Sequence, residues 1–591
     1  MRGFFLKRMS VPKICWGYAF EGFSKMGLSD SGRSVKEKGT NMEKDRKAMS
    51  RRGFLAGATA VLASSALVGC APGGQLADTA ASANTGIPNE WDREADVVCI
   101  GSGAGGSAAA WFALDGGLSA IVLEASNLPG GASAMNAGEL YLGGGTAIQR
   151  QLGFEDSPEN FKNFLLAHGT TGLKEELIDL YVESGPAIVD WLIELGVQFP
   201  AKAMPYEYPA YRLFPEDGEG TFAEFGLCEG GNESHPHYAA HWNPVPLMHW
   251  CAPDPNSVEE GYATYSAADG QGHDGTGYML PIIRDVKAKG GEYLLETVAS
   301  KLYADESGRV VGVRAEQDGS TINIKAHKGV VVAGGNWMGD PELVKTYAPR
   351  WASIEVMPLT VPGTDGSALK MAVDAGGAVV NGDSMWASVV ASMGSPTMVD
   401  CALYVDQRGT RLCSEDAYYS LSGNKCADVM SYGADSCAWI VFDQRAMDAY
   451  QRRFAAGLPE TIQDELHADS IEELAELMGA PALPDTVARY NQDAASGVDP
   501  IYENRTASMR HLEAPFWASR ITGFSVYSHG GLDIDANGQV LDKSESPIEG
   551  LFAAGRCARS TSESWYDAGT GMSCTQGLVV GRAIGQHLAA L

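Results

Sequence analysis

Three glycines with the spacing of a nucleotide-binding loop follow a short apolar run. Gly101, Gly103 and Gly106 come directly after the β-branched residues 95–100 and before a helical stretch at residues 107–114. The first glycine allows a tight turn, and the second lets the backbone approach a pyrophosphate. The N-terminus of the following helix offers N–H groups and a positive dipole to that pyrophosphate. The pattern predicts a strand, a glycine turn and a helix that bind a dinucleotide.

An acidic residue completes this motif. A second apolar run at residues 119–123 ends at Glu124, which stands 23 residues after Gly101. A carboxylate at the end of that strand can accept hydrogen bonds from ribose hydroxyl groups. The loop and Glu124 together predict a dinucleotide cofactor, and both NAD and FAD are compatible with the motif.

Further segments rich in small residues favour a flavin over a nicotinamide. The glycine-dense stretch at residues 129–146 can place its backbone against a flat ring, and its position fits a flavin. Two more apolar runs, at residues 328–335 and 550–556, end in small residues and predict parallel strands that run into a ligand crevice. The residues expected at the flavin are Ala132, Ser133, Gly138, Gly334, Gly335 and Gly555.

Together these segments resemble the FAD-binding set of the fumarate reductase and 3-ketosteroid dehydrogenase superfamily, over roughly residues 93–591. The Gly-Gly-Ala-Ser loop running to Tyr-Leu-Gly-Gly-Gly-Thr, and Ala-Ala-Gly-Arg followed by Gly571, Met572 and a serine, are most similar to 3-ketosteroid 4-dehydrogenases. The resemblance implies FAD as cofactor, with Gly571 and Met572 in its site. It implies an α/β fold class, with a Rossmann-like FAD-binding domain and an inserted α+β capping (catalytic) domain. The implied segments are 93–350 and 516–591 for the FAD-binding domain and 351–515 for the capping domain.

The resemblance places tyrosines where the proton chemistry is expected. A flavin can give or take a hydride, but reaction at a C=C bond also needs a proton donor or acceptor and a group that polarises the carbonyl. Residues 408–419 resemble the superfamily's Gly-x-Arg-Phe-x-Asn-Glu stretch, after which fumarate reductases have an arginine proton donor. Tyr419 stands in that arginine's place and is the expected proton relay, with Tyr418 as the second candidate.

Tyr527 and Tyr566 are the other expected catalytic tyrosines. Tyr527 replaces the substrate-binding histidine of fumarate reductases, and we expect the nearby His529 to be structural. Ala568 occupies the place of their carboxylate-clamping arginine, which disfavours fumarate as substrate. The Tyr-x-Ser-Gly-Met-Ser pattern of ketosteroid 4-dehydrogenases is altered here, and Tyr566 can fill the tyrosine's role from two residues earlier. Backbone amides around Gly569 could polarise a ketone.

The function implied by the resemblance is hydride transfer between flavin N5 and a carbon–carbon bond beside a carbonyl. A 3-ketosteroid-like enone is the leading substrate, handled by an ene-reductase or a dehydrogenase, because the carboxylate-clamping arginine is missing. One alternative is a fumarate- or urocanate-like reductase whose anionic substrate is held by Arg408 or Arg411. Another is a non-catalytic, flavin-binding surface lipoprotein. A reductase would need a quinone-linked or cytochrome electron partner, because the chain has no haem-attachment motif.

The N-terminal region has the features of an export signal. Arg51 and Arg52 precede an apolar run that is too short to span a bilayer and that ends in a lipobox cysteine, Cys70. We expect export by the twin-arginine pathway to the cell surface or periplasm, with membrane attachment only through the signal or through lipid on Cys70. The alternative is plain twin-arginine cleavage near Cys70 without lipid. The expected segments are an over-extended start at 1–48, the signal at 49–70 and a linker at 71–92.

Charge and cysteine spacing exclude other classes of partner and site. Residues 1–52 hold 13 Lys and Arg against 5 Asp and Glu, so the net charge of -30 corresponds to about -38 over the rest of the chain. Such an acidic body repels phosphate backbones, and nucleic acid is not an expected partner. The 11 cysteines include no Cys-x-x-Cys pair, and His235, His237 and His241 lack acidic ligand spacing, so no metal site is expected. We expect most cysteines to be buried free thiols.

Overall fold

The computed structural model describes most of the chain from residue 86 onward. The expected start and signal, and most of the expected linker, lie outside the described residues. None of the described helices is both long and apolar enough to span a lipid bilayer. The described residues are 86–168, 174–204, 224–262, 274–361, 363–389, 402–433, 436–455, 465–504, 509–560 and 569–591.

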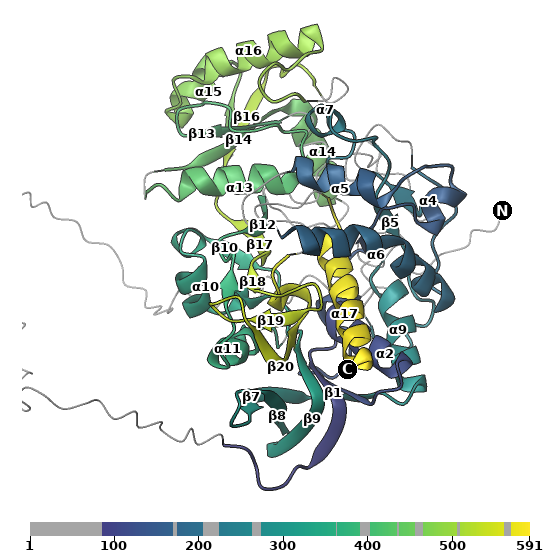
Figure 1. Cartoon of the computed structure of the whole chain (residues 1–591). Coiled ribbons are helices and arrows are strands. Elements are labelled where there is room, and N and C mark those ends of the chain that lie inside the picture. Colours follow the sequence, from purple (N-terminus) through teal and green to yellow (C-terminus); the bar gives the residue numbers. More distant parts are fainter. Residues whose placement is uncertain are drawn as a thin grey trace, which may run out of the picture. The chain divides into compact units, whose positions relative to one another are not determined.

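A largely parallel sheet in the order β19-β20-β9-β1-β2-β6 carries the glycine loop (Figure 1). Its strands are β1 (Arg93–Ile100), β2 (Ala120–Leu123), β6 (Glu292–Leu294), β9 (Ser320–Val332), β19 (Gln539–Leu541) and β20 (Pro547–Ala553). The strands predicted from the apolar runs are thus confirmed. The four central strands end in one row, because Ile100 pairs with Leu123 and Val332, and Val332 pairs with Ala553. Whatever follows these strands therefore meets at a single edge of the sheet.

The carboxyl-terminal halves of the central strands are fully buried, as expected where both faces of a parallel sheet are covered. A hairpin of β7 (Thr297–Ala304) and β8 (Val310–Gln317) continues antiparallel into β9. The eight described cysteines are free, and all except Cys574 are buried.

Helices α2 (Ala104–Asp115) and α17 (Met572–Ala590) lie side by side (Figure 1). Glycines four residues apart on α17 make the contact close. A Cβ on Gly581 would lie 2.5 Å from the Gly105 oxygen, and a Cβ on Gly585 would lie 2.6 Å from the Cβ of Phe112. Because the contacting residues advance towards the C-terminal end of both helices together, the two helices run in the same direction. The start of the C-terminal helix is therefore held beside the start of the helix that follows the glycine loop.

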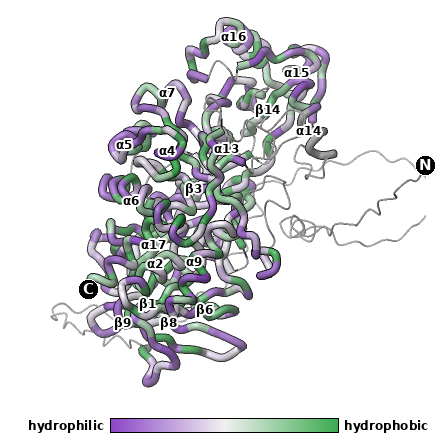
Figure 2. The backbone as a smooth tube through the Cα atoms, turned by 90° about the vertical axis from the view of Figure 1, so that its right-hand side faces the viewer, coloured by the Kyte–Doolittle hydropathy of each residue, from purple (hydrophilic) through white to green (hydrophobic). Residues whose placement is uncertain are grey.

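A second, antiparallel sheet lies mostly in the expected capping region. Its order is β13-β14-β16-β15. Strand β16 (Phe516–Arg520) lies after the expected boundary at residue 515. Two helices cover it with buried apolar faces, and Figure 2 shows hydrophilic and hydrophobic residues alternating along them. The elements are β13 (Ala402–Asp406), α13 (Tyr419–Met430), β14 (Ala438–Asp443), α14 (Gln444–Ala455), β15 (Leu466–Ala468), α15 (Ile471–Met478), α16 (Leu483–Ser496) and β16 (Phe516–Arg520).

Strand β17 (Phe524–Ser528) joins segments that are far apart in the sequence. It is parallel to β10 (Val356–Pro358) on one side and antiparallel to β12 (Met385–Val389) on the other. In the β12–β17 register, Trp386 lies directly opposite Tyr527. This pairing decides which side chains surround one of the expected catalytic tyrosines.

The remaining elements complete the framework around these sheets. Strands β3 (Glu139–Tyr141), β5 (Met248–Trp250) and β4 (Leu227–Cys228) form a small antiparallel sheet, and β11 (Val379–Val380) pairs with β18 (Gly531–Leu532). The other helices are α3 (Gly131–Ala134), α4 (Ala147–Gln151), α5 (Pro158–Ala167), α6 (Glu175–Glu194), α7 (Pro236–Ala239), α9 (Thr276–Ala288), α10 (Pro341–Tyr347) and α11 (Ser367–Asp374).

Candidate active site

The glycine loop is shaped so closely that side chains cannot replace its glycines. Gly101 has a φ of +102°, and a Cβ there would lie 2.4 Å from the oxygen of Ala333. A Cβ on Gly106 would lie 2.0 Å from the Gly101 oxygen. Helix α2 starts after Gly103 with no capping side chain on that residue and no acidic residue in its first turn. The loop and helix N-terminus fit a bound pyrophosphate.

Glu124 lies at the end of β2 beside this loop, as predicted. Its buried carboxylate accepts a hydrogen bond from the Ser102 hydroxyl, and it also accepts from the Ser126 N–H and hydroxyl, both at 2.9 Å. These serine contacts hold the carboxylate at the edge where the strands end. Its predicted contact with a ribose remains a prediction.

The segment around α3 lies directly against the glycine loop. The hydroxyl of Ser133 accepts the N–H of Ala104 at 3.0 Å, at the first residue of α2, and Ala132 is exposed beside it. Gly138 has a φ of +78°, and a Cβ there would lie 2.8 Å from the Asp274 oxygen. The folding of residues 130–138 therefore depends on small residues in close backbone contact.

The other expected cofactor residues lie at the same edge of the sheet. A Cβ on Gly334 would lie 2.4 Å from that of Ala368, whereas a Cβ on Gly555 would enter open space. Gly571 has a φ of +98° and precedes the buried Met572 at the start of α17. The residues present thus form a cradle that a flavin nucleotide fits, built from the ends of four strands and two helix N-termini.

Three of the four expected catalytic tyrosines form one cluster around Trp386. The Tyr527 ring is stacked on the Trp386 ring with centroids 4.6 Å apart and planes at 4°. The Tyr419 ring meets Trp386 edge-on at 5.5 Å and lies 4.3 Å from the Tyr418 ring. Tyr566 and Ala568 lie outside the described residues. The tertiary structure therefore brings together tyrosines that the sequence identified one at a time.

The hydrogen bonds in this cluster have a defined direction. The indole N–H of Trp386 can only donate, and it donates to the Tyr418 hydroxyl at 3.2 Å. The Tyr418 hydroxyl in turn donates to the Tyr419 hydroxyl at 3.1 Å. Tyr418 is buried, whereas Tyr419 is half-buried. Tyr419 therefore accepts from Tyr418, and it is the more accessible member of the pair.

Asn232 positions the backbone of the tyrosine pair. The Nδ1 of His168 lies 2.9 Å from the carbonyl oxygen of Phe164, so this nitrogen donates. Burial lowers the pKa of His168 to about 4, which leaves its Nε2 as an acceptor for the Asn232 amide at 3.1 Å. The Asn232 side-chain oxygen then accepts the Tyr418 N–H at 2.7 Å. The amide orientation of Asn232 is thus set on both sides.

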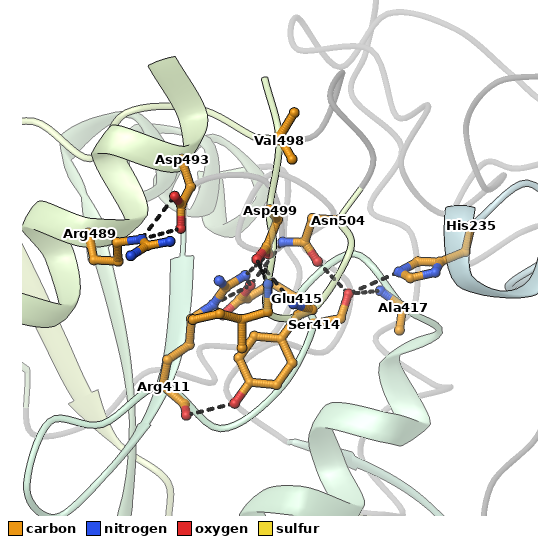
Figure 3. A network of polar contacts seen from close by, with 12 residues as sticks. His235, Arg411, Ser414, Glu415, Ala417, Arg489, Asp493, Val498, Asp499 and Asn504 are labelled. Carbon is orange, nitrogen blue, oxygen red and sulfur yellow. Dashed lines mark hydrogen bonds and ion pairs between the residues drawn. The ribbon is translucent and has the colours of Figure 1, made fainter. Parts of the chain in front are cut away.

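A buried polar network holds the segment just before the tyrosines (Figure 3). His235, at the start of α7, contacts the Ser414 hydroxyl at 3.1 Å, and Ser414 donates to Asn504. The Asn504 amide donates to Glu415 at 3.1 Å. These contacts tie the segment entering α13 to a separate part of the chain. Sequence spacing alone could not identify them.

Arg411 is unavailable as an anion clamp, which corrects one expectation. Its guanidinium is paired with Glu415 and lies 2.8 Å from Asp499, and both carboxylates are buried. Arg408 is exposed in the turn after β13. Neither arginine belongs to the tyrosine cluster, so the anion-binding role suggested for them has no geometric basis.

The loop at residues 229–235 connects the cluster to the C-terminal segment. Its Gly230 oxygen accepts the Thr570 N–H at 3.0 Å, and Glu233 accepts the Gly230 N–H at 2.8 Å. Burial, together with the neighbouring Glu229, raises the pKa of Glu233 to about 8. Glu233 is therefore protonated at neutral pH, which allows two buried carboxyl groups to lie close together.

The sequence reasoning did not identify Trp386, Asn232 or Arg556 as site residues. Arg556 follows Gly555, and its guanidinium carbon lies 4.1 Å from the centre of the Tyr527 ring. Its position within Ala-Ala-Gly-Arg was a usable signal, because an arginine after a glycine at a cofactor strand is chemically unusual among small residues. Trp386 and Asn232 stand in no motif, and only the strand register and loop contacts reveal them.

Comparison with known proteins gives consistent matches over this framework. A family model described as FAD binding domain matches residues 96–573. A solved 3-ketosteroid-delta4-(5alpha)-dehydrogenase from Rhodococcus jostii RHA1, in complex with 4-androstene-3,17-dione, is 31% identical with a TM-score of 0.70, over 85% of this chain and 98% of that chain. A 3-oxosteroid 1-dehydrogenase of Mycolicibacterium smegmatis is 26% identical over 78% of this chain and 92% of its own length. A digoxin reductase of Eggerthella lenta is 25% identical over 92% of this chain and 97% of its own length.

Proposed function

Because the chain belongs to the FAD binding domain family and is an FAD-dependent oxidoreductase acting on CH–CH groups, we propose that its substrate is a 3-ketosteroid-like enone or the corresponding saturated ketone. The Rhodococcus relative is named for a 3-ketosteroid and was solved with a steroid dione. The reaction moves a hydride to or from the carbon–carbon bond beside the ketone. When bound, FAD supplies or accepts that hydride.

The observation that carries this proposal is the directed donor chain from Trp386 through Tyr418 to Tyr419. In reduction, Tyr419 gives a proton to the carbon next to the ketone, and in dehydrogenation it takes that proton away. Tyr418 steadies the Tyr419 oxygen by donating to it, which favours the phenolate form after the proton has left. Tyr527, stacked on Trp386, supplies a further phenol hydroxyl to the cluster.

The proposed domains meet at this cluster. Trp386, Tyr418 and Tyr419 belong to the proposed capping domain at residues 351–515, and Tyr527 belongs to the returning part of the FAD-binding domain at residues 516–591. A substrate held between them would have its reacting carbon between the flavin cradle and the tyrosine hydroxyls. This arrangement supports a proton donor supplied by the capping side and a hydride donor supplied by the nucleotide-binding side.

Neither arginine first considered for an unsaturated acid supports that substrate class. The two arginines first considered for its carboxylate are either neutralised by buried acids or exposed in a turn. Aromatic rings and hydroxyl groups, which suit an apolar ketone, dominate the tyrosine cluster.

The test is an anaerobic assay of the purified, dithionite-reduced holoprotein that follows flavin reoxidation. The panel contains 3-ketosteroid enones, the matching saturated 3-ketosteroids as controls, and fumarate, urocanate and cinnamate. Reoxidation by the enones, with none by the acids or the saturated ketones, is the expected result. Reoxidation by acids alone would replace the ketone by an unsaturated acid, and reoxidation by no compound would favour a non-catalytic flavin protein.

For localisation we propose export by the twin-arginine pathway with lipid on Cys70, supported by the sequence of residues 49–70. An exported reductase would receive its electrons from a quinone-linked or cytochrome partner. Mass spectrometry of the membrane fraction from cells producing the protein, compared with a Cys70→Ala variant, tests the anchor. A mature N-terminus without lipid in both samples would refute it.

A further inference from the structure

Arg556 is held rigidly by three contacts at the junction of the flavin cradle and the tyrosine cluster. Its Nη1 donates to the backbone carbonyl oxygen of Ser528 at 3.0 Å. Its Nε donates to the hydroxyl of Ser573, in the first turn of α17. Its guanidinium carbon lies 4.1 Å from the centre of the Tyr527 ring. The arginine therefore connects β17 to the start of the C-terminal helix.

The Tyr527 ring is covered on both faces. Trp386 is stacked parallel to it at 4.6 Å, and Arg556 lies over it at 4.1 Å. Two groups this close cannot share one face, so Tyr527 lies between them. Its ring is not a platform for substrate, and only its hydroxyl edge remains to meet a ligand. The cation therefore lies directly against the cluster.

One nitrogen of this fixed cation has no acceptor among the residues that the structure describes. Nη2 of Arg556 is buried and makes no hydrogen bond there, and no described carboxylate pairs with the guanidinium. The contrast with Arg411 and Arg559 concerns the carboxylate alone, since Arg411 is paired with Asp499 at 2.8 Å and Arg559 with Asp533 at 2.9 Å. A buried, charged donor without an acceptor is costly. Its position beside the cradle points to a ligand oxygen as the acceptor.

We infer that Arg556, through Nη2, binds the oxygen that gains negative charge during hydride transfer; this rests on the proposed function. In reduction, the hydride brings two electrons to the β-carbon and forms the new C–H bond there. The C=C electron pair moves to form the bond between the α-carbon and the carbonyl carbon, and the carbonyl pair moves onto oxygen as an enolate. The enolate collapses when the α-carbon takes the proton from Tyr419. Arg556 neutralises the oxygen while it carries the charge.

The same oxygen chemistry has two sources in a flavin enzyme. One is the ketone oxygen of the substrate, and the other is a pyrimidine carbonyl oxygen of the flavin, which becomes more negative on reduction. A fixed guanidinium suits either oxygen, because charge-assisted hydrogen bonds are stronger than neutral ones. The two sources predict different measurable changes when the cation is removed.

The test uses Arg556→Met and Arg556→Lys holoproteins and two binding probes that need no turnover. The first probe is 4-nitrophenolate, a planar oxyanion, titrated into the oxidised protein by its absorption change. The second is sulfite, which reports the positive field at the flavin, measured together with the flavin midpoint potential. If the acceptor is the substrate oxygen, Arg556→Met weakens 4-nitrophenolate binding roughly tenfold to hundredfold, leaves the potential nearly unchanged, and Arg556→Lys restores part of the affinity.

If the acceptor is the flavin oxygen, the Met variant instead has a lower midpoint potential and weaker sulfite binding, with phenolate affinity retained. The inference is overturned if neither probe's dissociation constant changes by more than about twofold and the midpoint potential of the flavin does not shift. Because the probes report binding in the oxidised protein, this outcome is distinct from a failure of the enone assay. If the Met variant does not retain FAD, Ser573→Ala replaces it in the test. This variant removes the hydrogen-bond partner of Nε but keeps the cation, so the same quantities should change in the same direction by a smaller amount.

Arg582→Met is the matched control. Arg582 lies in α17, the helix whose Ser573 contacts Arg556. It lies over the Phe112 ring at 5.9 Å and donates to the Ser184 hydroxyl at 3.4 Å. It is ten residues after Met572, which corresponds to about 15 Å along a helix. Equal changes in this control and in the Arg556 variants would assign the effect to general loss of charge and would overturn the inference.

Discussion

Replacing Tyr419 by phenylalanine removes the hydroxyl that accepts from Tyr418, while it keeps the ring against Trp386 and Tyr418. A positioned general acid contributes about 10²–10⁴-fold to the rate of a proton-transfer step. This corresponds to about 3–5 kcal/mol of the activation free energy, at about 1.4 kcal/mol for each factor of ten. We therefore expect Tyr419→Phe to slow enone reduction by about this factor at saturating substrate.

The fold should tolerate this change. The Tyr418 hydroxyl loses its acceptor, and a hydrogen bond of this kind is worth about 0.5–1.5 kcal/mol. Because Tyr419 is half-buried, water can replace part of the lost contact. Thermal unfolding of the holoprotein should consequently show a small decrease in Tm, with FAD content unchanged.

Tyr418→Phe is the matched comparison. It leaves the Trp386 N–H without its acceptor in a buried site, which costs about 1–3 kcal/mol of stability. It keeps the Tyr419 hydroxyl, so the rate should fall only roughly tenfold, the equivalent of one supporting hydrogen bond. Tyr418→Phe should thus affect Tm more than Tyr419→Phe does, and affect the rate less.

Anaerobic stopped-flow spectroscopy of the reduced proteins with a 3-ketosteroid enone measures the rate, and differential scanning calorimetry measures Tm. The reasoning is refuted if Tyr419→Phe reacts within about threefold of the unmodified protein, since a general acid must contribute more than that. A larger rate effect for Tyr418→Phe than for Tyr419→Phe would show that Tyr418, and not Tyr419, is the proton donor.

Three further predictions concern the framework. Gly106→Ala places a Cβ 2.0 Å from a backbone oxygen, so the protein should be purified with much less FAD by its absorbance ratio, whereas Gly433→Ala, where nothing lies within 4 Å, should keep its FAD; equal FAD contents would contradict the loop geometry. Since the pKa of Glu233 is raised from 4.5 to about 8, the folded state holds a proton that the unfolded state releases, and stability falls as pH rises between these values. Glu229→Gln removes the neighbouring charge and should lose less Tm between pH 6 and pH 8.5 than the unmodified protein, and an equal loss would show that the pair is uncoupled. Asn232→Ala should lower the unfolding free energy by about 1–3 kcal/mol and slow the reaction without loss of FAD, and an unchanged rate would mean that the tyrosine pair is positioned by other contacts.

The nucleotide-binding half of the site was readable because its signals are local. The strand, the glycine turn and the helix around Gly101 are consecutive, and each glycine is required by contacts within that short stretch or with the strand ends beside it. Glu124 follows by the same local rule. Backbone geometry of this kind leaves a direct trace in residue type, because only glycine tolerates the close approach and the positive φ at Gly101.

The tyrosines were readable one at a time through family resemblance, but their grouping was not. Tyr527 meets Trp386 only because β12 pairs with β17 in one particular register, and a shift by one residue would turn either ring to the other face of the sheet. The direction of the donor chain follows from Trp386 being a donor only, and Trp386 belongs to no motif. Resemblance therefore identified candidates, and strand pairing decided how they interact.

Charge state was likewise a matter for the tertiary structure. Arg411 was a reasonable anion clamp by position, yet Asp499, 88 residues further along the chain, neutralises it in the fold. Arg556 was part of a recognised motif, but only the tertiary structure shows that its Nη2 is buried without an acceptor among the described residues and that no described carboxylate pairs with its guanidinium. The sequence by itself determined the cofactor class and the α/β framework, because these depend on consecutive residues. The surroundings of each charged or hydroxyl group were decided only by tertiary contacts, because burial and pairing depend on residues that the chain brings together from distant positions.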